Sequence, residues 1–150
     1  MAELRDRQSA GPVTLETPAG IASLAVIREF VADACQRLAA PSDAVIDLVQ
    51  AVDEAATNVT LHGYKGFPGP VEITVARNGN WLTVTIRDEA PPFDPTCVGP
   101  LNLPKLLKER SIGGFGIHLM RCFTDAMIYH RLPGGGNELI LVKHLPLASS

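Results

Sequence analysis

The chain has 150 residues, a length typical of one domain, and 46% of them are apolar, so it can bury one core of ordinary size. Thirteen basic and sixteen acidic residues give a net charge of −3, which disfavours nucleic acid and anionic membranes as partners. No apolar run approaches the roughly 20 residues of a membrane span, and the charged N-terminus does not match a signal peptide. Three separated cysteines favour reduced thiols in the cytoplasm over disulfides or a zinc site.

A polar segment precedes the first predicted element. Residues 1–11 are expected to form a loosely held terminus, and residues 12–150 a single domain. Residues 13–17 alternate apolar and polar side chains with period two, which predicts a short strand.

Two amphipathic helices are predicted next. Apolar residues recur at three- and four-residue spacing over residues 21–38, and Pro41 ends that pattern. The same period returns after Ser42, which we expect to cap the N-terminus of the second helix. It continues until His62 and Gly63 provide a stop signal.

The pattern then changes to that of paired strands. Residues 71–75 and 82–86 alternate apolar and polar side chains, and the Asn78-Gly79 dipeptide between them is a strong hairpin signal. Residues 89–112 show no sustained period and are long for a passive connection in a compact domain, which indicates a functional loop.

A third helix over residues 115–123 and a second hairpin complete the predicted elements. The hairpin joins residues 126–131 to residues 138–144 through a glycine-rich loop. Three helices with antiparallel hairpins predict an α/β sandwich of the α+β class, in which helices cover one face of a mixed, largely antiparallel sheet.

Three polar residues of the second predicted helix, Glu54, Asn58 and His62, are four residues apart and therefore share one side of it. The row runs from the outside of the helix toward the edge of its apolar face. One interpretation is a solvated face that ends in a histidine near the negative end of the helix dipole. The other is a row of functional side chains.

Asp88 is a second candidate. It has the same parity as Val84 and Ile86, so its carboxylate is expected on the core side if the strand stays regular. Burying a carboxylate is costly unless something bonds to it, so an acid at the end of an apolar face is a candidate ligand contact. The alternative is that the strand ends at Arg87 and Asp88 caps the following turn.

A glycine-rich run, Gly113-Gly114-Phe115-Gly116, precedes the expected helix start near Ile117. Glycines there let backbone N–H groups approach an anion at a helix N-terminus, where the dipole favours negative charge. The run lacks the lysine of a P-loop and the third glycine of a dinucleotide fingerprint. Phosphate binding and a flexible hinge both fit these glycines.

Taken in chain order, residues 54–58 (Glu-Ala-Ala-Thr-Asn), 88–93 (Asp-Glu-Ala-Pro-Pro-Phe) and 113–117 (Gly-Gly-Phe-Gly-Ile) resemble the N box and the two glycine boxes of the GHKL ATPases. The His62-Gly63-Tyr64 end of the second helix and the final hairpin around Asn137 look most similar to small bacterial anti-sigma factor serine kinases. The resemblance covers roughly residues 15–145 and implies an ATP site between helices and sheet.

The resemblance implies a role for each matching residue. Glu54 is the expected general base, and Asn58 is expected to hold a magnesium ion. Asp88 is expected to bond to the adenine amino group. The expected ATP-binding residues, with the glycines as backbone contacts to phosphate, are Asn58, His62, Asp88, Ala90, Phe93, Gly113, Gly114, Phe115, Gly116 and Ile117.

Elementary chemistry agrees with these roles. A hydroxyl nucleophile needs a proton acceptor within hydrogen-bond reach, which Glu54 can supply. Magnesium prefers oxygen ligands and keeps waters, so one amide oxygen from Asn58 together with ATP phosphates is sufficient. Residues 94–112 would then form a lid over the triphosphate. The cations of this lid are Lys105, Lys108 and Arg110.

One residue departs from the family pattern. Ala90 stands where the first glycine box usually has glycine, and its methyl group could narrow the adenine pocket or fix the loop.

Two functions of different classes are therefore expected. The first is an ATP-dependent kinase of a small anti-sigma factor antagonist, with a sigma factor as a further partner and a homodimer as a further assembly. The second is a nucleotide-binding module that sequesters a partner without transferring phosphate. Glu54 favours the first function, and Ala90 favours the second.

Overall fold

The computed structural model describes residues 11–97, 99 and 112–146. Within these residues, no helix combines the length and the apolar character needed to cross a bilayer. The elements in chain order are β1 (Val13–Pro18), α2 (Ile21–Arg37), α3 (Ser42–Asn58), the π-helical turn η1 (Val59–Gly63), β2 (Pro70–Asn78), β3 (Trp81–Asp88), the short 3-10 turn η2 (Pro95–Cys97), α5 (Ile112–Phe123), β4 (Ala126–Arg131) and β5 (Asn137–His144).

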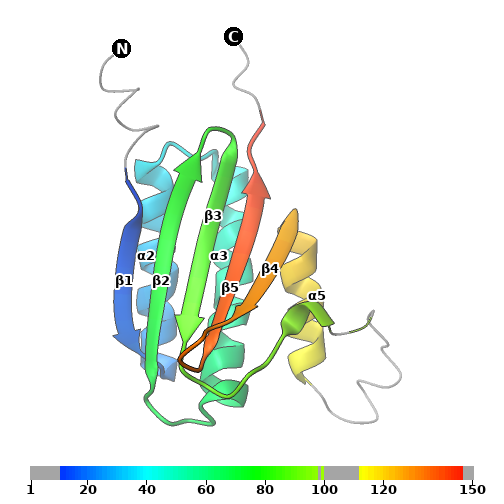
Figure 1. Cartoon of the computed structure of the whole chain (residues 1–150). Helices are drawn as coiled ribbons and strands as arrows, with labels where there is room; N and C mark the ends of the chain where they lie inside the picture. The colour runs from blue at the N-terminus through cyan, green and yellow to red at the C-terminus, as the bar shows by residue number, and fades with distance from the viewer. Residues whose placement is uncertain (1–10, 98, 100–111, 147–150) are drawn as a thin grey trace.

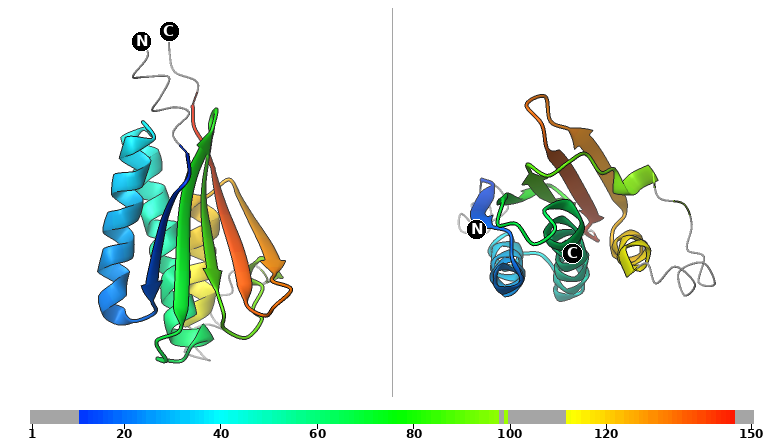
Figure 2. Two further views of the ribbon diagram at one scale, coloured as in Figure 1. Left: turned by 60° about the vertical axis from the view of Figure 1, so that its left-hand side comes forward. Right: turned by 90° about the horizontal axis from the view of Figure 1, so that it is seen from below.

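The strands form one five-stranded sheet in the order β1-β2-β3-β5-β4 (Figure 1). Every neighbouring pair is antiparallel, so the described sheet is wholly antiparallel. The helices α2, α3 and α5 lie together on one face of it, with α3 packed against both of the others (Figure 2). The predicted α+β sandwich with helices on one face is confirmed.

The apolar rows of the central strands build the sheet side of the core. Ile73 and Val75 on β2 pair with Ile86 and Val84 on β3, and all four are 0–1% exposed. Burying side chains of this size stabilises the fold by roughly 1.5–3 kcal/mol each, so a one-residue slip of register would be costly. Asp88 comes two residues after Ile86 and therefore stays on the core side of β3.

Both predicted hairpins are confirmed, with a shift of one residue in the first turn. Asn78 pairs with Trp81 as the last residue of β2, so Gly79 and Asn80 are the two loop residues. Gly79 occupies the left-handed region with φ +62, which a residue with a side chain adopts only with strain. The second hairpin joins β4 to β5.

The start of α3 differs from the prediction. Ser42 is the first residue of the helix and not its N-cap, and no side chain caps this end. The carbonyl of Pro41 already accepts the first helical hydrogen bond, from the Val45 N–H at 3.1 Å. Pro41 is therefore the N-cap, with an extended backbone of φ −62° and ψ 149°, and the predicted serine cap is wrong.

The end of α3 is also irregular. The α-helix stops at Asn58, and η1 follows as one wider turn in which the Tyr64 N–H bonds to the Val59 carbonyl at 2.8 Å. Such π turns add one residue per turn and shift the side chains that follow. His62 therefore lies in this turn and not in the regular α-helix that was predicted to reach it.

The helix α5 begins earlier than predicted. It starts at Ile112, so Gly113, Gly114 and Gly116 lie inside the helix and do not precede it. A glycine costs a helix about 1 kcal/mol relative to alanine, which made this run look like a helix boundary. The packing of α5 against α3, with Ile117 only 2% exposed, offsets that cost.

Gly136 lets the second hairpin approach the end of β3. Its φ is +103, and a Cβ there would overlap the carbonyl oxygen of Asp88. We expect Gly136→Ala to lower the free energy of unfolding by about 2 kcal/mol, from a strained backbone and this overlap. Gly134→Ala is the matched control in urea unfolding, because a Cβ at Gly134 meets none of the described atoms within 4 Å. Equal losses of unfolding free energy in the two variants would contradict the close approach of Gly136 to the Asp88 carbonyl.

Candidate functional site

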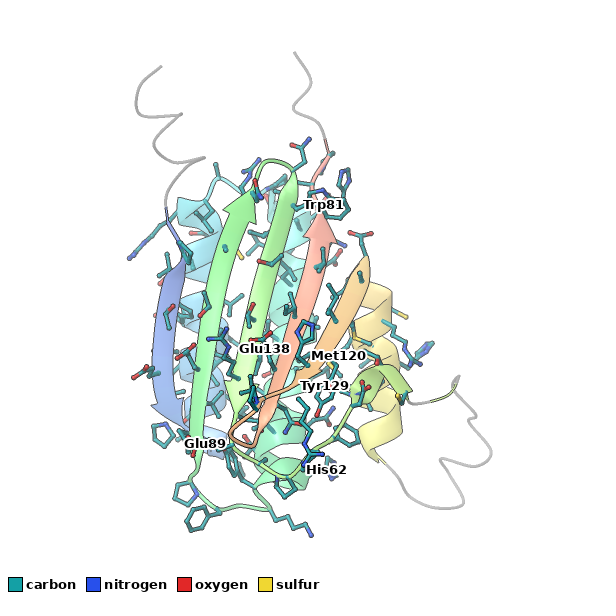
Figure 3. All side chains as sticks on the ribbon, viewed as in Figure 1. His62, Trp81, Glu89, Met120, Tyr129 and Glu138 are labelled. Carbon is teal, nitrogen blue, oxygen red and sulfur yellow. The ribbon has the colours of Figure 1, made fainter. Side chains whose placement is uncertain are left out.

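A cavity of about 310 Å³ lies between the end of α3, η1 and one end of the sheet. This volume is at the lower end of the range for small-molecule sites. Figure 3 shows the labelled His62 and Tyr129 toward this end of the sheet. Most of the lining is apolar, and the lining residues with polar side chains are Asn58, His62, Lys65, Asp88, Tyr129 and Asn137.

Asp88 supplies the buried carboxylate of this cavity. It is 6% exposed, and its Oδ1 accepts hydrogen bonds from the Ala90 N–H and from Asn137 Nδ2, both at 2.9 Å. Burial raises the pKa of the Asp88 carboxyl, and these two bonds partly offset the rise. The strand stays regular through Asp88, so the predicted core-side orientation of its carboxylate is confirmed. Through its bond to the Ala90 N–H, Asp88 Oδ1 also holds the following turn.

The Glu54 carboxylate lies against the backbone of α5. A Cβ at Gly116 would stand 2.7 Å from Glu54 Oε2, so glycine at this position is what leaves room for the carboxylate. Burial, and secondarily the charge of Asp53, raises the pKa of Glu54 above its ordinary value. A more basic carboxylate is a better proton acceptor when ionised.

Asn58 lies one helical turn after Glu54 and lines the cavity. Its Nδ2 is buried and has no hydrogen-bond partner within the residues that the structure describes. An unpartnered buried polar group costs about 1–3 kcal/mol, so the amide is well suited to a ligand. Because an amide can rotate to present either end, Asn58 fits a group with acceptor oxygens or a cation that takes oxygen ligands.

The family comparison agrees with this geometry. Residues 17–143 match the model of the histidine kinase-like ATPase domain, which spans α2 to β5 and the whole cavity. The chain belongs to this family. The resemblance to the GHKL ATPases is confirmed, and ATP is the ligand that the histidine kinase-like ATPase fold implies for the cavity.

The relatives of this chain in the family include an anti-sigma factor and two proteins named as serine or serine/threonine kinases. The chain is 29% identical over 120 residues to anti-sigma F factor of Thermoanaerobacter, which covers 79% of this chain and 82% of that one. It is 32% identical over 98 residues to the serine/threonine-protein kinase BtrW of Bordetella bronchiseptica, with coverages of 65% and 68%. It is 27% identical over 117 residues to serine-protein kinase RsbW of Bacillus cereus, with coverages of 75% and 73%.

Two solved structures share the fold of this histidine kinase-like ATPase. The RsbU and RsbW domains of a Mycobacterium tuberculosis protein match with a TM-score of 0.64 at 16% identity, over 89% of this chain and 32% of that one. The SiaB–SiaC complex of Pseudomonas aeruginosa matches with a TM-score of 0.64 at 14% identity, over 87% and 88%. At these identities, the likeness shows the fold alone.

Ala90, the residue that departs from the ATPase family pattern, is 3% exposed and lines the cavity. A Cβ at Gly63 would lie 3.0 Å from the Ala90 Cβ, so the missing side chain of Gly63 makes space for the alanine methyl group. The methyl group packs against η1 in this way. Phe93 and His62 also line the cavity, and both are exposed to solvent at its rim.

The remaining predicted ATP contacts of the ATPase domain lie on α5. Ile117 is buried in the core, away from the cavity lining, so its role as an ATP contact stays a prediction. Gly113, Gly114 and Phe115 fall within the first turn of α5. The predicted lid cations, Lys105, Lys108 and Arg110, lie outside the described residues.

Asn137 is the site residue that the sequence reasoning missed. The sequence pattern indicates only that it belongs to the final hairpin, but it is 6% exposed, lines the cavity and bonds directly to Asp88. A polar residue directly after Gly135 and Gly136 reads as part of a turn. No local sequence signal could have found it, because its place opposite Asp88 follows from the pairing of β5 with β3.

Proposed function

We propose that this chain is an ATP-dependent protein serine kinase of the anti-sigma factor type. Its substrate would be a small antagonist protein, and a sigma factor would be a further partner. The observation that carries the proposal is the Glu54 carboxylate, which lies against Gly116 beside the unpartnered amide of Asn58. Relatives named as serine kinases support the same activity.

The proposed binding mode follows the chemistry of the cavity. The Asp88 carboxylate accepts a hydrogen bond from the adenine amino group, and the triphosphate extends toward Asn58 and the N-terminal end of α5. That end lies at the same end of the molecule as η1 (Figure 1). Helix N-terminal N–H groups favour phosphate, and the glycines there let phosphate oxygens approach the backbone.

The proposed transfer step uses Glu54 as a general base. The serine hydroxyl of the substrate loses its proton to the Glu54 carboxylate and forms a bond to the γ-phosphorus. The bond from that phosphorus to the β–γ bridging oxygen breaks, and ADP leaves with the electron pair. Asn58 would hold magnesium through its amide oxygen, and the bound ion would neutralise charge on the phosphate oxygens.

The test is transfer of labelled phosphate. The chain is incubated with ATP labelled at the γ-phosphate, with magnesium, and with the protein products of genes adjacent to its own. We expect the label on a serine of one small protein. Tight binding of such a protein with no label transferred would favour the interaction module instead. Ala90 no longer favours that alternative, because Gly63 accommodates its methyl group.

Gly116→Ala tests whether Gly116 serves to position Glu54 for phosphate transfer or to bind the nucleotide. The new methyl group would meet Glu54 Oε2 at 2.7 Å and displace a flexible side-chain end, so the variant is expected to fold. We expect transfer to slow about tenfold, because small displacements of a catalytic group are costly. ATP affinity, measured by calorimetry, should change much less. A loss of affinity as large as the loss of rate would place Gly116 in binding and not in the positioning of Glu54.

A further inference from the structure

The segment between β3 and η2 forms one wall of the cavity, and side chains fix its shape. Pro91 and Pro92 have no N–H, so residues 89–93 carry three backbone donors. Each of these donors bonds to a side-chain oxygen: Glu89 to Tyr64 Oη at 2.6 Å, Ala90 to Asp88 Oδ1 at 2.9 Å and Phe93 to Asn137 Oδ1 at 2.9 Å.

Asn137 makes more of these contacts than any other side chain that the structure describes at this wall. Its Nδ2 donates to Asp88 Oδ1 at 2.9 Å and to the carbonyls of residues 90 and 91 at 3.3 and 3.1 Å. Its Oδ1 accepts from the Phe93 N–H and from the Tyr129 hydroxyl. A neutral amide has two N–H donors and two lone pairs, so the three donor contacts share two N–H groups, one of them bifurcated, and the two acceptor contacts use both lone pairs.

The bond to Asp88 also orients the carboxylate. Asn137 and Asp88 are register partners on β5 and β3, and the Asn137 bond and the Ala90 N–H bond both go to Oδ1. Among the described residues no hydrogen bond goes to Oδ2, so its lone pairs remain for a donor in the cavity. The Asn137 bond also lowers the pKa of Asp88 against the effect of burial, which favours the ionised, hydrogen-bond-accepting form.

We propose that Asn137 is a positioning residue for the nucleotide base: it holds the 88–93 wall and the Asp88 carboxylate in the geometry that receives the base, without contacting the base itself. This inference rests on the proposed ATP site. It assigns to β5 a role in base recognition that works entirely through other residues.

Asn137→Asp tests the proposal without a change of side-chain size. The variant keeps the acceptor oxygen but replaces the donor to Asp88 with a second carboxylate oxygen. At pH 8 both carboxylates are expected to be ionised and to repel each other, so affinity for ATP with magnesium should fall about tenfold or more. At pH 5.5 the pair can share one proton and restore the bond, so affinity should return to within about threefold of the unaltered protein.

Other titratable groups lie in or beside the same wall and are present in both proteins. His62, Lys65 and Tyr129 line the cavity, the Tyr64 hydroxyl bonds to the Glu89 N–H, and the exposed carboxylate of Glu89 belongs to the same segment. The unaltered protein is therefore measured at each pH, and the readout is the ratio of the two affinities. If Asn137 does not act on ATP binding through the Asp88 carboxylate, the ratio should not change with pH. Glu138→Gln is the control on β5, since Glu138 pairs with Arg87 and His130 and is not among the cavity lining residues, and its ratio should stay within about threefold at both pH values.

Hydrogen exchange in the absence of nucleotide tests the role of Asn137 independently of the proposed kinase activity. Without nucleotide, the Ala90 amide, which bonds to the Asp88 oxygen that Asn137 holds, should exchange faster in Asn137→Asp than in the unaltered protein at pH 8. If the unaltered protein does not bind ATP, the kinase proposal fails, while unchanged Ala90 exchange is the result that overturns the role of Asn137. Equal ATP affinity of both proteins at pH 8 overturns it as well.

A double variant that exchanges the two side chains tests the proposal if Asn137→Asp alone does not fold. Asp88→Asn combined with Asn137→Asp restores one amide–carboxylate bond between β3 and β5, and circular dichroism should show a folded protein. It moves the carboxylate to the other strand, so ATP affinity should stay about tenfold or more below that of the unaltered protein at both pH values. ATP affinity equal to that of the unaltered protein would overturn the proposal.

Discussion

Replacing Glu54 by glutamine is expected to slow phosphate transfer by a factor of about 10² to 10⁴ while ATP remains bound. Glutamine keeps the size of the side chain beside Gly116, so the packing of α3 against α5 is preserved. It cannot accept the proton of a serine hydroxyl as a carboxylate can. The rate is measured with γ-labelled ATP and the phosphorylated partner, and ATP affinity is measured by calorimetry on the same preparation.

Asp53→Asn is the matched control for that experiment. Asp53 is the neighbouring carboxylate on α3, but it faces Arg28, with which it forms an ion pair at 2.7 Å. Partly exposed pairs of this kind contribute about 0–1 kcal/mol, so the control should fold and transfer phosphate at a rate close to that of the unaltered protein. If Glu54→Gln transfers phosphate as well as this control does, the proton acceptor is another group.

The features that depend on local pattern were predicted correctly from the sequence. Alternation along residues 82–86 predicted both the strand and the side on which Asp88 lies, because the period of a strand carries through to its last residue. The helices α2 and α3 followed from their apolar spacing. These elements bring the buried carboxylate and the Glu54–Asn58 row to one end of the domain.

The features that depend on contacts between distant residues were not predicted. The bond from Asn137 to Asp88 requires the pairing of β5 with β3, and the two residues are 49 positions apart. The close approach of Glu54 to Gly116 requires α5 to pack against α3, and the glycine run looked like a helix boundary before that packing was known. The π turn η1 had no signal in the apolar period.

The effect of Ala90 illustrates the same limit. From the sequence, its methyl group was expected to narrow the pocket or fix the loop. In the structure, the space beside it depends on Gly63, which comes from a different element and lacks a side chain. A departure from a family pattern at one position is therefore interpretable only together with the residue that it contacts.

Replacing Asp88 by asparagine is expected to weaken ATP binding by about 1 to 3 kcal/mol, or about 5- to 150-fold. The amide has one oxygen, which the Ala90 N–H and Asn137 Nδ2 both need as their acceptor. Its NH₂ group would then face the cavity and meet the adenine amino group, which is also a donor. Affinity is measured by calorimetry with ATP and magnesium.

The same substitution is expected to change base preference, and this is its most specific consequence. Guanine carries a carbonyl oxygen where adenine carries its amino group, so the NH₂ of Asp88→Asn can donate to guanine. The ratio of ATP to GTP affinity should therefore fall in this variant. It should stay unchanged in Glu89→Gln, because Glu89 is exposed and contributes its backbone N–H, not its carboxylate, to the cavity wall. Unchanged ATP affinity together with an unchanged ratio in Asp88→Asn would remove Asp88 from the recognition of the base.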